Sequence, residues 1–252
     1  MSEPKVVLIT GASGGVGRGI ALACGAAGWT VWVAARRAEQ GAAVAAEVDN
    51  AGGVGRYVAC DVIDPASVEA AVAAVMSESG RLDGVVHNST SGRSSQAQPF
   101  DEIDLDTIQD QVAVSVRGLY LLARAALPAL RESAGSMVVT TSEAGFEGKK
   151  LLAGYAMVKA AQRGAVRGLA REWGPLGVRV NAVAPLAMTE AMHRAFASEP
   201  AMEARVKTRI PLGRVGDATE DVGPVVHFLL SDAARYLTGQ TLMADGGSCQ
   251  IT

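Results

Sequence analysis

Short apolar runs alternate with longer segments of helical periodicity along the whole chain. The short runs, which we predict to be β-strands, are 5–10, 30–35, 55–60, 84–87, 136–141, 178–183 and 241–244. The longer segments, which we predict to be helices, are 16–27, 39–50, 65–79, 102–131, 155–173 and 218–231. This alternation is typical of a parallel sheet, and runs rich in Val, Ile, Leu and Ala fit strands covered on both faces. We therefore predict one α/β domain over 1–252, a doubly wound sheet of seven parallel strands with helices on both faces.

One segment, 186–214, departs from this alternation. It combines scattered charges with the large apolar residues Met188, Met192, Phe196, Met202 and Ile210, and we expect one or two short helices in it. Because the segment follows the carboxyl end of a strand, where ligands bind in such sheets, we interpret it as a substrate flap. The alternative is a packed surface excursion. Its Met and Phe content favours a substrate with apolar surface.

Composition and charge argue against several classes of protein. The chain has 23 basic and 26 acidic residues and a net charge of -3 without long runs of like charge, which favours a small-molecule partner over nucleic acid. We expect no membrane span, since no apolar segment approaches about 18 residues. The apolar start is too short for a signal peptide, so we expect a cytoplasmic protein. We expect Cys24 and Cys60 to be buried small hydrophobes, and neither the cysteines nor the histidines are spaced as metal ligands.

A glycine-rich turn joins the first predicted strand to the first predicted helix. Glycine permits positive φ and close backbone approach, and the amino end of a helix offers free N–H groups and a positive dipole to a pyrophosphate. Between a strand and a helix, this turn predicts a Rossmann-like dinucleotide site, and a tight turn without a ligand is the weaker alternative. The residues expected to line it are Gly11, Ser13, Gly14, Gly15, Val16 and Gly17.

The end of the second predicted strand indicates which nicotinamide coenzyme is bound. An acidic residue there would bond the ribose 2′-hydroxyl of NAD, whereas arginine suits the 2′-phosphate of NADP. The chain has Arg36 and Arg37, and no acid before Glu39. We therefore predict NADP(H). After the third strand, Asp61 and Val62 either bring a carboxylate near the adenine amino group or form a helix cap or turn, and the sequence leaves both readings open.

A tyrosine and a lysine supply the candidate chemistry. Tyr155 and Lys159 stand four residues apart, and Tyr155 follows Ser142 by thirteen residues. The four-residue separation puts the phenol and the ammonium on one face of a helix, where the positive charge can lower the pKa of the phenol. The phenol then becomes a usable proton donor and acceptor. Together with the glycine turn, these residues indicate nicotinamide-dependent carbonyl or alcohol chemistry.

With these residues in place, the chain resembles the short-chain dehydrogenase/reductase family over essentially its whole length, and 3-oxoacyl-ACP reductase-like members in particular. The matching motifs are TGASGGVG at 10–17, LDG at 82–84, Ser142, YAMVK at 155–159, VNAVAP at 180–185 and TGQTLMADGG at 238–247. The resemblance implies that Tyr155 donates a proton to the carbonyl oxygen as hydride passes from the nicotinamide. It implies that Ser142 polarises that oxygen, and that Lys159 binds the nicotinamide ribose and lowers the pKa of Tyr155.

The resemblance also adds Asn88 and Pro185 to the expected cofactor contacts. Since family members are commonly homotetramers or dimers, we expect helices 102–131 and 155–173 to supply symmetric interfaces. The resulting prediction is an NADP(H)-dependent enzyme that interconverts an alcohol with a ketone, an aldehyde or a 3-oxoacyl group. Substrate identity, direction and stereochemistry stay open.

Three departures from the family pattern keep a second hypothesis open, that of a catalytically weak dinucleotide-binding sensor or regulator. The chain has His-Asn-Ser-Thr at 87–90 where the family has Asn-Asn-Ala-Gly, Ser115 where many members have Asn, and Leu186 where glycine is usual. In the family that Asn supports a water linking the lysine to solvent. Ser115 either takes over this relay or is an ordinary helical serine. Leu186 either narrows the nicotinamide pocket or re-aims the flap.

Lys149 and Lys150 lie in the loop that rims the substrate cleft in this family. They either meet an anionic carrier, such as the phosphopantetheine or nucleotide of an acyl thioester, or are a solvated pair. The sequence favours the solvated pair.

Overall fold

The computed structural model describes residues 4–94 and 96–249, and its central feature is a sheet of seven parallel strands. The strands are β1 (Val6–Thr10), β2 (Thr30–Ala35), β3 (Val54–Ala59), β4 (Gly84–His87), β5 (Ser136–Thr140), β6 (Arg179–Pro185) and β7 (Thr241–Ala244). Their order is β3-β2-β1-β4-β5-β6-β7, so the winding direction reverses between β1 and β4. Ligands bind outside the carboxyl ends of the strands at such a reversal. The predicted Rossmann-like fold is confirmed.

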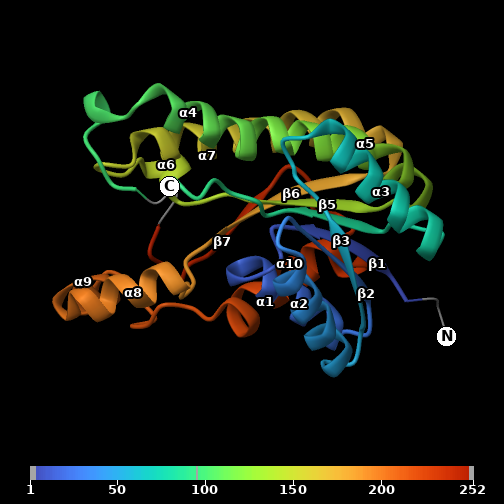
Figure 1. The fold of residues 1–252 in the computed structure, drawn as a ribbon, viewed down its shortest axis with the longest axis horizontal. Coiled ribbons are helices and arrows are strands. Elements are labelled where there is room, and N and C mark those ends of the chain that lie inside the picture. Colours follow the sequence, from blue (N-terminus) through green and yellow to red (C-terminus); the bar gives the residue numbers. More distant parts are fainter. Residues whose placement is uncertain (1–3, 95, 250–252) are drawn as a thin grey trace.

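Helices cover both faces of this sheet (Figure 1). One face carries α3 (Pro65–Ser79), α5 (Gly118–Ser133) and α7 (Ala153–Trp173), and the other carries α1 (Gly15–Ala26), α2 (Ala38–Asn50) and α10 (Gly223–Leu230). Successive strand residues point to opposite faces, so Val6 and Leu8 of β1 pack under the first set and Val7 and Ile9 under the second. Burial on both sides explains why the strands are continuous apolar runs.

The stretch that we predicted as one helix over 102–131 is divided. It consists of α4 (Leu105–Val112), a π-helical segment (Ala113–Arg117) and α5. An 18-residue window within Leu105–Ser133 has a mean hydropathy of 1.3, so by length and composition alone this stretch could cross a membrane, contrary to our expectation that no segment approaches a span. In this structure 44% of its apolar window is buried, and Leu119, Leu122 and Leu130 belong to the core. We therefore interpret it as a core helix.

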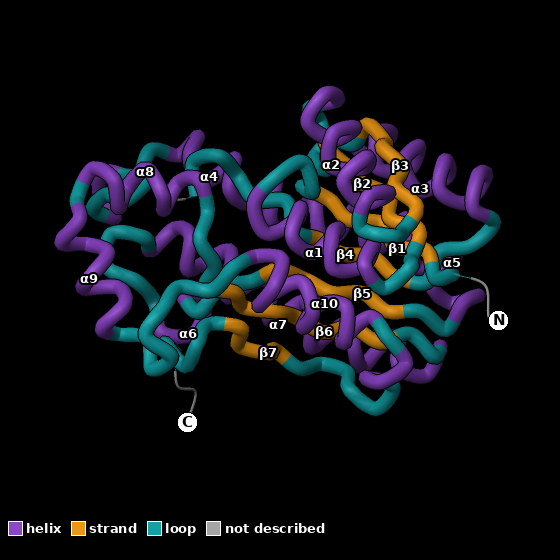
Figure 2. The backbone as a smooth tube through the Cα atoms, turned by 90° about the horizontal axis from the view of Figure 1, so that it is seen from below, coloured by secondary structure: helices purple, strands orange, loops and turns teal. Residues whose placement is uncertain are grey.

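The segment 186–214 contains α8 (Glu190–Ser198) and α9 (Pro200–Thr208), in line with the expected short helices. Phe196, Ile210 and Val215 form an apolar cluster of their own, and Leu186 packs against it. Both views of the chain put α8 and α9 at the end of the molecule where α4 and α6 (Ala144–Glu147) also lie, away from the N terminus (Figures 1 and 2). Leu186 thus anchors the segment, whose role as a flap over substrate stays a prediction.

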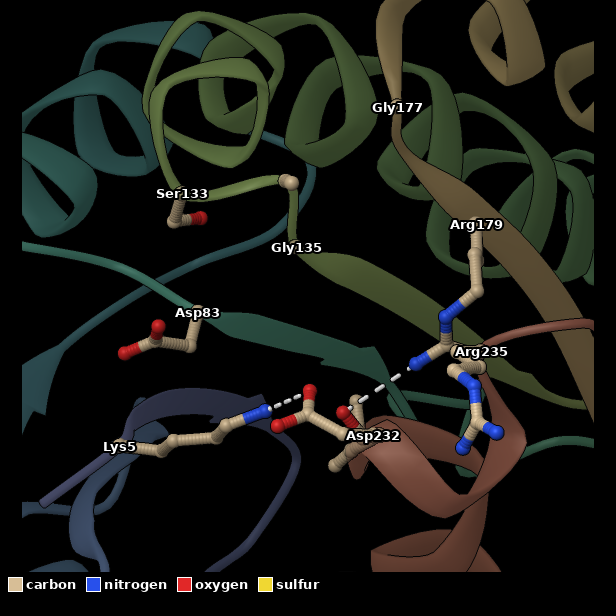
Figure 3. Close-up of a pocket in the computed structure, with 10 residues that line it drawn as sticks. Lys5, Asp83, Ser133, Gly135, Gly177, Arg179, Asp232 and Arg235 are labelled. Atoms are coloured by element: carbon tan, nitrogen blue, oxygen red, sulfur yellow. Dashed lines mark hydrogen bonds and ion pairs between the residues drawn. The ribbon is translucent and has the colours of Figure 1, made fainter. Parts of the chain in front are cut away.

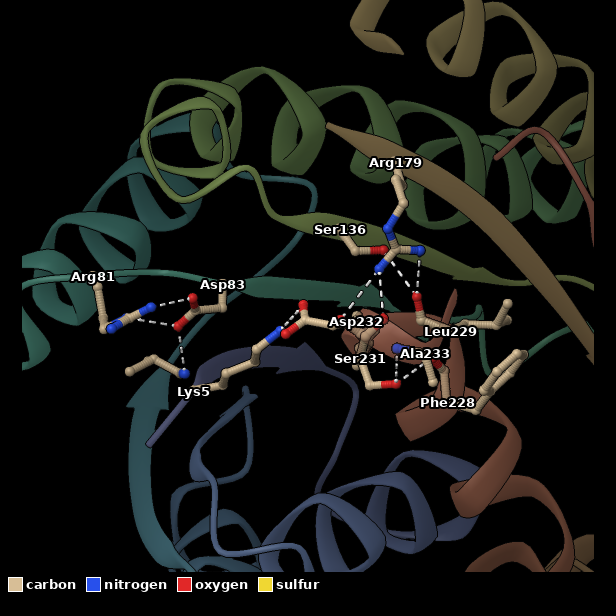
Figure 4. A network of polar contacts seen from close by, with 12 residues as sticks. Lys5, Arg81, Asp83, Ser136, Arg179, Phe228, Leu229, Ser231, Asp232 and Ala233 are labelled. Atoms are coloured by element: carbon tan, nitrogen blue, oxygen red, sulfur yellow. Dashed lines mark hydrogen bonds and ion pairs between the residues drawn. The ribbon is translucent and has the colours of Figure 1, made fainter. Parts of the chain in front are cut away.

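The amino-terminal edge of the sheet is braced by charged residues (Figures 3 and 4). Asp83, just before β4, accepts hydrogen bonds from Arg81 and from the first backbone N–H of β1. Arg179 at the start of β6 donates to carbonyl groups at the end of α10, and Lys5 pairs with Asp232 at 2.5 Å. A cavity of about 240 Å³ lies among these groups. Because the charged side chains around the cavity pair with one another, we interpret them as structural contacts that hold the first residues of the strands in place.

Candidate active site

The glycine-rich turn between β1 and α1 brings backbone groups unusually close together. Gly11 and Gly15 have φ values of +67° and +54°, in the left-handed region that favours glycine. At Gly17, a Cβ atom would lie 2.5 Å from the carbonyl oxygen of Gly11 and 2.5 Å from Nδ2 of Asn88. The Asn88 amide also donates to that Gly11 oxygen at 3.1 Å, which ties β4 to the turn. A side chain at position 17 would therefore push α1 away from the strands.

The amino end of α1 is open for an anion. Gly14 caps the helix without a side-chain hydrogen bond, and the first turn carries no acidic residue. The backbone N–H groups and the positive end of the helix dipole are therefore unscreened by the protein. A Cβ atom at Gly15 would meet nothing within 4 Å, so there is space in front of this end. Together with Ser13 and Val16 in the same turn, the cradle fits the pyrophosphate of a dinucleotide.

Two arginines stand beside this cradle at the end of β2. Arg37 donates from Nη2 to the Ser13 hydroxyl at 3.1 Å, and Nη1 of Arg36 lies 4.0 Å from Oδ2 of Asp61. Both arginines are exposed. Guanidinium groups in this position can bind a phosphate bidentately. Two guanidinium groups therefore stand beside the dinucleotide cradle.

The other expected cofactor contacts occupy strand ends. Asp61 follows β3 and accepts the Ile63 backbone N–H at 3.3 Å, whereas α3 is capped by Asp64. Within the alternative reading, a helix cap or a turn, Asp61 makes the turn and Asp64 caps the helix. Val62 is buried against α5, and Pro185 ends β6 beside β7. Whether Asp61 reaches the adenine stays a prediction.

Ser142, Tyr155 and Lys159 come together where β5 ends and α7 begins. Ser142 follows β5 closely, and Tyr155 and Lys159 share a face of the first turns of α7. Nζ of Lys159 lies 5.6 Å from the centroid of the Tyr155 ring and donates to the backbone oxygen of Thr140 at 2.8 Å. The spacing in the sequence thus brings a hydroxyl, a phenol and an ammonium into one small volume.

Burial dominates the electrostatics of this trio. It raises the pKa of Tyr155, which hydrogen bonding with Ser142 lowers and the Glu143 carboxylate raises further. Burial also lowers the pKa of Lys159 from 10.5 to about 7. The predicted lowering of the tyrosine pKa by Lys159 is therefore absent from this structure, because desolvation disfavours both charged forms. A bound ribose, whose hydroxyl oxygens accept hydrogen bonds, would favour the protonated lysine.

Sequence reasoning missed a buried carboxylate, Glu143. The Ser142 hydroxyl donates to Oε2 of Glu143 at 2.7 Å, and Lys149 pairs with Oε1. Burial raises the pKa of Glu143, but the hydrogen bonds from Lys149 and Ser142 outweigh it and the pKa lies below its usual value. Lys149 is thus an ion-pair partner, while Lys150 is exposed. The sequence does show an acidic residue directly after the candidate serine. Its position in the sequence does not show which side chains would pair with it.

Several buried polar atoms behind Lys159 lack a protein partner in the part of the chain that the structure describes. They are both ring nitrogens of His87 and the side-chain oxygens of Ser115, Thr140 and Gln162. Burial, and then the charge of Lys159, lower the pKa of His87 to about 3, so this histidine is neutral. Ser115 lies in the π-helical segment, and its backbone oxygen accepts from Gln162 at 2.9 Å. A proton relay through Ser115 stays a prediction.

Two of the buried cysteines have unreactive thiols. Burial raises the pKa of Cys24 to about 12 and that of Cys60 to about 11, and both thiols are free and buried as predicted. Within residues 4–94 and 96–249, no group of three or more His, Cys, Asp or Glu side chains is placed to hold a metal ion.

Comparison with known proteins shows to which family the chain belongs. A family model described as enoyl-(acyl carrier protein) reductase matches residues 11–249. The chain is 36% identical to D-threitol dehydrogenase of Mycolicibacterium smegmatis over 247 residues, covering 97% of this chain and 93% of that protein. It is 34% identical to 3-oxoacyl-[acyl-carrier-protein] reductase FabG of Staphylococcus aureus over 249 residues, with coverage of 98% and 99%. The chain belongs to the short-chain dehydrogenase/reductase family.

Solved structures of this family have the same fold. A short-chain type dehydrogenase/reductase from Mycobacterium ulcerans superposes with a TM-score of 0.91 at 30% identity, covering 98% of this chain and 91% of that one. Gluconate 5-dehydrogenase of Burkholderia cenocepacia, in complex with NADP and tartrate, has a TM-score of 0.89 at 26% identity and coverage of 97% and 94%. A 3-ketoacyl-(acyl-carrier-protein) reductase of Brucella melitensis complexed with NADH has a TM-score of 0.87 at 29% identity and coverage of 97% and 98%. The protein is thus a short-chain oxidoreductase of alcohols and carbonyl compounds, in a family whose members bind either coenzyme.

Proposed function

We propose that the protein is an NADP(H)-dependent oxidoreductase that interconverts a ketone, an aldehyde or a 3-oxoacyl group with the corresponding alcohol. The observation that carries the proposal is the cluster of Ser142, Tyr155 and Lys159 beside an open dinucleotide cradle. Relatives named as a threitol dehydrogenase and a 3-oxoacyl reductase support the alcohol and carbonyl chemistry and leave the substrate open.

Different side chains of the protein act on the substrate oxygen and on the coenzyme. A bound nicotinamide supplies or accepts the hydride. Tyr155 gives a proton to the carbonyl oxygen during reduction and takes it back during oxidation, and Ser142 holds the same oxygen. Lys159, held by Thr140, binds the nicotinamide ribose and favours the ionised phenol while it keeps its proton. Ser115 in the π-helical segment would help to pass protons from Lys159 to solvent.

The function is tested by following NADPH at 340 nm with a panel of ketones, aldehydes and 3-oxoacyl thioesters, and NADP+ with the matching alcohols. Turnover of any substrate class supports the proposal. If NADPH binds but nothing in the panel reacts in either direction, the protein is instead the dinucleotide-binding sensor that the departures at 87–90, Ser115 and Leu186 left open.

Coenzyme preference should depend on the arginines at the end of β2. Replacing Arg36 and Arg37 by alanine is expected to raise the Kd for NADPH by about 10²- to 10⁴-fold, because each of the two lost charge-assisted hydrogen bonds to the 2′-phosphate contributes about 1.5–3 kcal/mol. The Kd for NADH should change little. Fluorescence titration of both coenzymes measures this. The control is Arg235→Ala at the opposite edge of the sheet, and an equal loss for NADPH and NADH would disprove the assignment.

We further propose a homodimeric or homotetrameric assembly. Large apolar side chains are exposed on the helices that we expected to form interfaces, namely Leu105 and Val112 of α4, Tyr120 of α5 and Met157 of α7. Such side chains are typical of subunit contacts. Light scattering should give two or four times the 25.8 kDa chain mass, and Tyr120→Glu with Met157→Glu should lower it. A monomer at micromolar concentration would contradict this.

A further inference from the structure

The buried carboxylate of Glu143 is the feature of this site that the proposed function leaves unexplained. Only 6% of Glu143 is exposed, and its carboxylate lies directly against the candidate catalytic serine. Burying a carboxylate is costly unless it is paired and hydrogen-bonded. Within the described residues, the side chain of Glu143 hydrogen-bonds with Ser142 and Lys149, both in the stretch that joins β5 to α7. Among the described residues these hydrogen bonds hold only this stretch and link no distant elements of the fold.

The contact with Glu143 determines what Ser142 can do. A serine hydroxyl has one proton and two acceptor sites. Here the proton goes to Oε2 of Glu143 at 2.7 Å, and one acceptor site receives the backbone N–H of Ala144 at 3.2 Å. The Tyr155 phenol is the other hydrogen-bonding neighbour of Ser142. While Glu143 holds its proton, Ser142 can accept a hydrogen bond from that phenol or from an alcohol, but it cannot donate to a substrate oxygen. The serine becomes a donor only when Glu143 receives a hydrogen bond from elsewhere.

A second hydroxyl group on the substrate would supply that hydrogen bond. Ser142 Oγ and Glu143 Oε2 lie 2.7 Å apart, a spacing that matches two hydroxyls on neighbouring carbon atoms. A bond to a carboxylate is charge-assisted and stronger than one between neutral groups. A substrate with a single hydroxyl leaves Glu143 bonded to Ser142. The carboxylate also disfavours an anionic group in this position, although the ion pair with Lys149 reduces its charge.

We propose that Glu143 binds the hydroxyl adjacent to the reacting one, and that the protein acts on vicinal diols and polyols. This inference rests on the proposed function and names its substrate class. In the oxidation, the C–H bond at the reacting carbon breaks and its hydride goes to the oxidised nicotinamide, while the hydroxyl proton goes to the Tyr155 phenolate. The product is an α-hydroxyketone or α-hydroxyaldehyde, and its remaining hydroxyl stays bonded to Glu143. The reverse reaction reduces the same hydroxycarbonyl compound.

The experiment compares 2,3-butanediol with 2-butanol, which has the same carbon chain and lacks the second hydroxyl. The proteins are the wild type, Glu143→Gln, Glu143→Val and the control Glu147→Gln, which removes a nearby exposed carboxylate from the same segment. Two quantities are measured with NADP+ and with NAD+ present. They are the ratio of kcat/KM for diol over alcohol, and the ratio of the Kd values for the two compounds from calorimetric titration.

In the wild type we expect both ratios to favour the diol by about 10- to 100-fold, the range of a hydrogen bond to a charged group. Glu143→Gln should reduce the preference by about 10-fold or more and Glu143→Val should abolish it, whereas Glu147→Gln should keep it. A wild type that binds both compounds equally, or variants that keep the wild-type preference, would overturn the inference. If Glu143→Val does not fold, the isosteric Glu143→Gln carries the comparison.

The binding measurement separates the two proposals. Diol binding that depends on Glu143 without turnover of either compound supports the inference and contradicts the proposed function. Turnover of both compounds with equal efficiency in all four proteins supports the function and contradicts the inference.

Discussion

Tyr155→Phe is expected to lower kcat by about 10²- to 10⁴-fold, the range that a positioned general acid or base contributes. The substitution keeps the ring that lies 5.6 Å from Nζ of Lys159 and removes only the hydroxyl. Packing and coenzyme binding should therefore change little, so the loss should appear in kcat more than in KM. Steady-state kinetics with the best substrate of the panel measure the loss in both directions, and titration with NADPH measures the Kd.

The matched control for this substitution is Tyr236→Phe, which removes a hydroxyl from a side chain in a residue that is 99% exposed. It should leave kcat, KM and the Kd for NADPH unchanged. A Tyr155→Phe protein with more than about a tenth of wild-type kcat would contradict the assigned proton transfer. In that case Ser142 or Glu143 would have to handle the proton, since Ser142 hydrogen-bonds with the phenol and Glu143 with Ser142.

The fold could be predicted from the sequence because its strongest signals are local. Buried parallel strands need apolar side chains on both faces, so β1 and its neighbours are short continuous runs. The turn over 10–17 also carries a local signal, because Gly11 and Gly15 have positive φ and Gly17 closely approaches the Gly11 oxygen. These features can be recognised without knowledge of the tertiary structure.

Two other features that sequence reasoning missed have no local signal in the sequence. The π-helical segment at 113–117 has no apolar signature of its own, so the sequence predicted one continuous helix. The burial that raises the pKa of Tyr155 and lowers that of Lys159 comes from the whole domain. The four-residue spacing predicted that these side chains meet, but not that desolvation would exceed their mutual attraction.

Lys159→Met is expected to stabilise the coenzyme-free protein while it weakens coenzyme binding and turnover. Complete burial lowers the pKa of Lys159 from 10.5 to about 7, which corresponds to at most about 5 kcal/mol of destabilisation at low pH. Methionine fills similar space without a charge, but it gives up the bond to the Thr140 oxygen. We therefore expect the free energy of unfolding to rise by about 1–3 kcal/mol near pH 6.

The pH dependence of this gain distinguishes a buried charge from better packing. Between about pH 7 and pH 10.5 the unfolded chain holds a proton on Lys159 that the folded protein has lost, so wild-type stability from this group rises with pH. The penalty is complete below about pH 7. The difference between Lys159→Met and wild type should therefore shrink as pH rises from 7 to 9 in urea unfolding. Titration of the buried thiols affects both proteins and cancels in this difference.

The control is Lys150→Met, which removes the same charge from an exposed position in the neighbouring loop and should alter neither stability nor its pH dependence. A constant advantage of Lys159→Met over wild type across this range would mean that packing, not charge, causes the gain. A loss of stability at every pH would mean that the bond to Thr140 outweighs desolvation. If the result is as expected, burial of Lys159 destabilises the folded protein when no coenzyme is bound. Because the ribose hydroxyls would relieve it, coenzyme binding and the protonation of Lys159 should then be coupled.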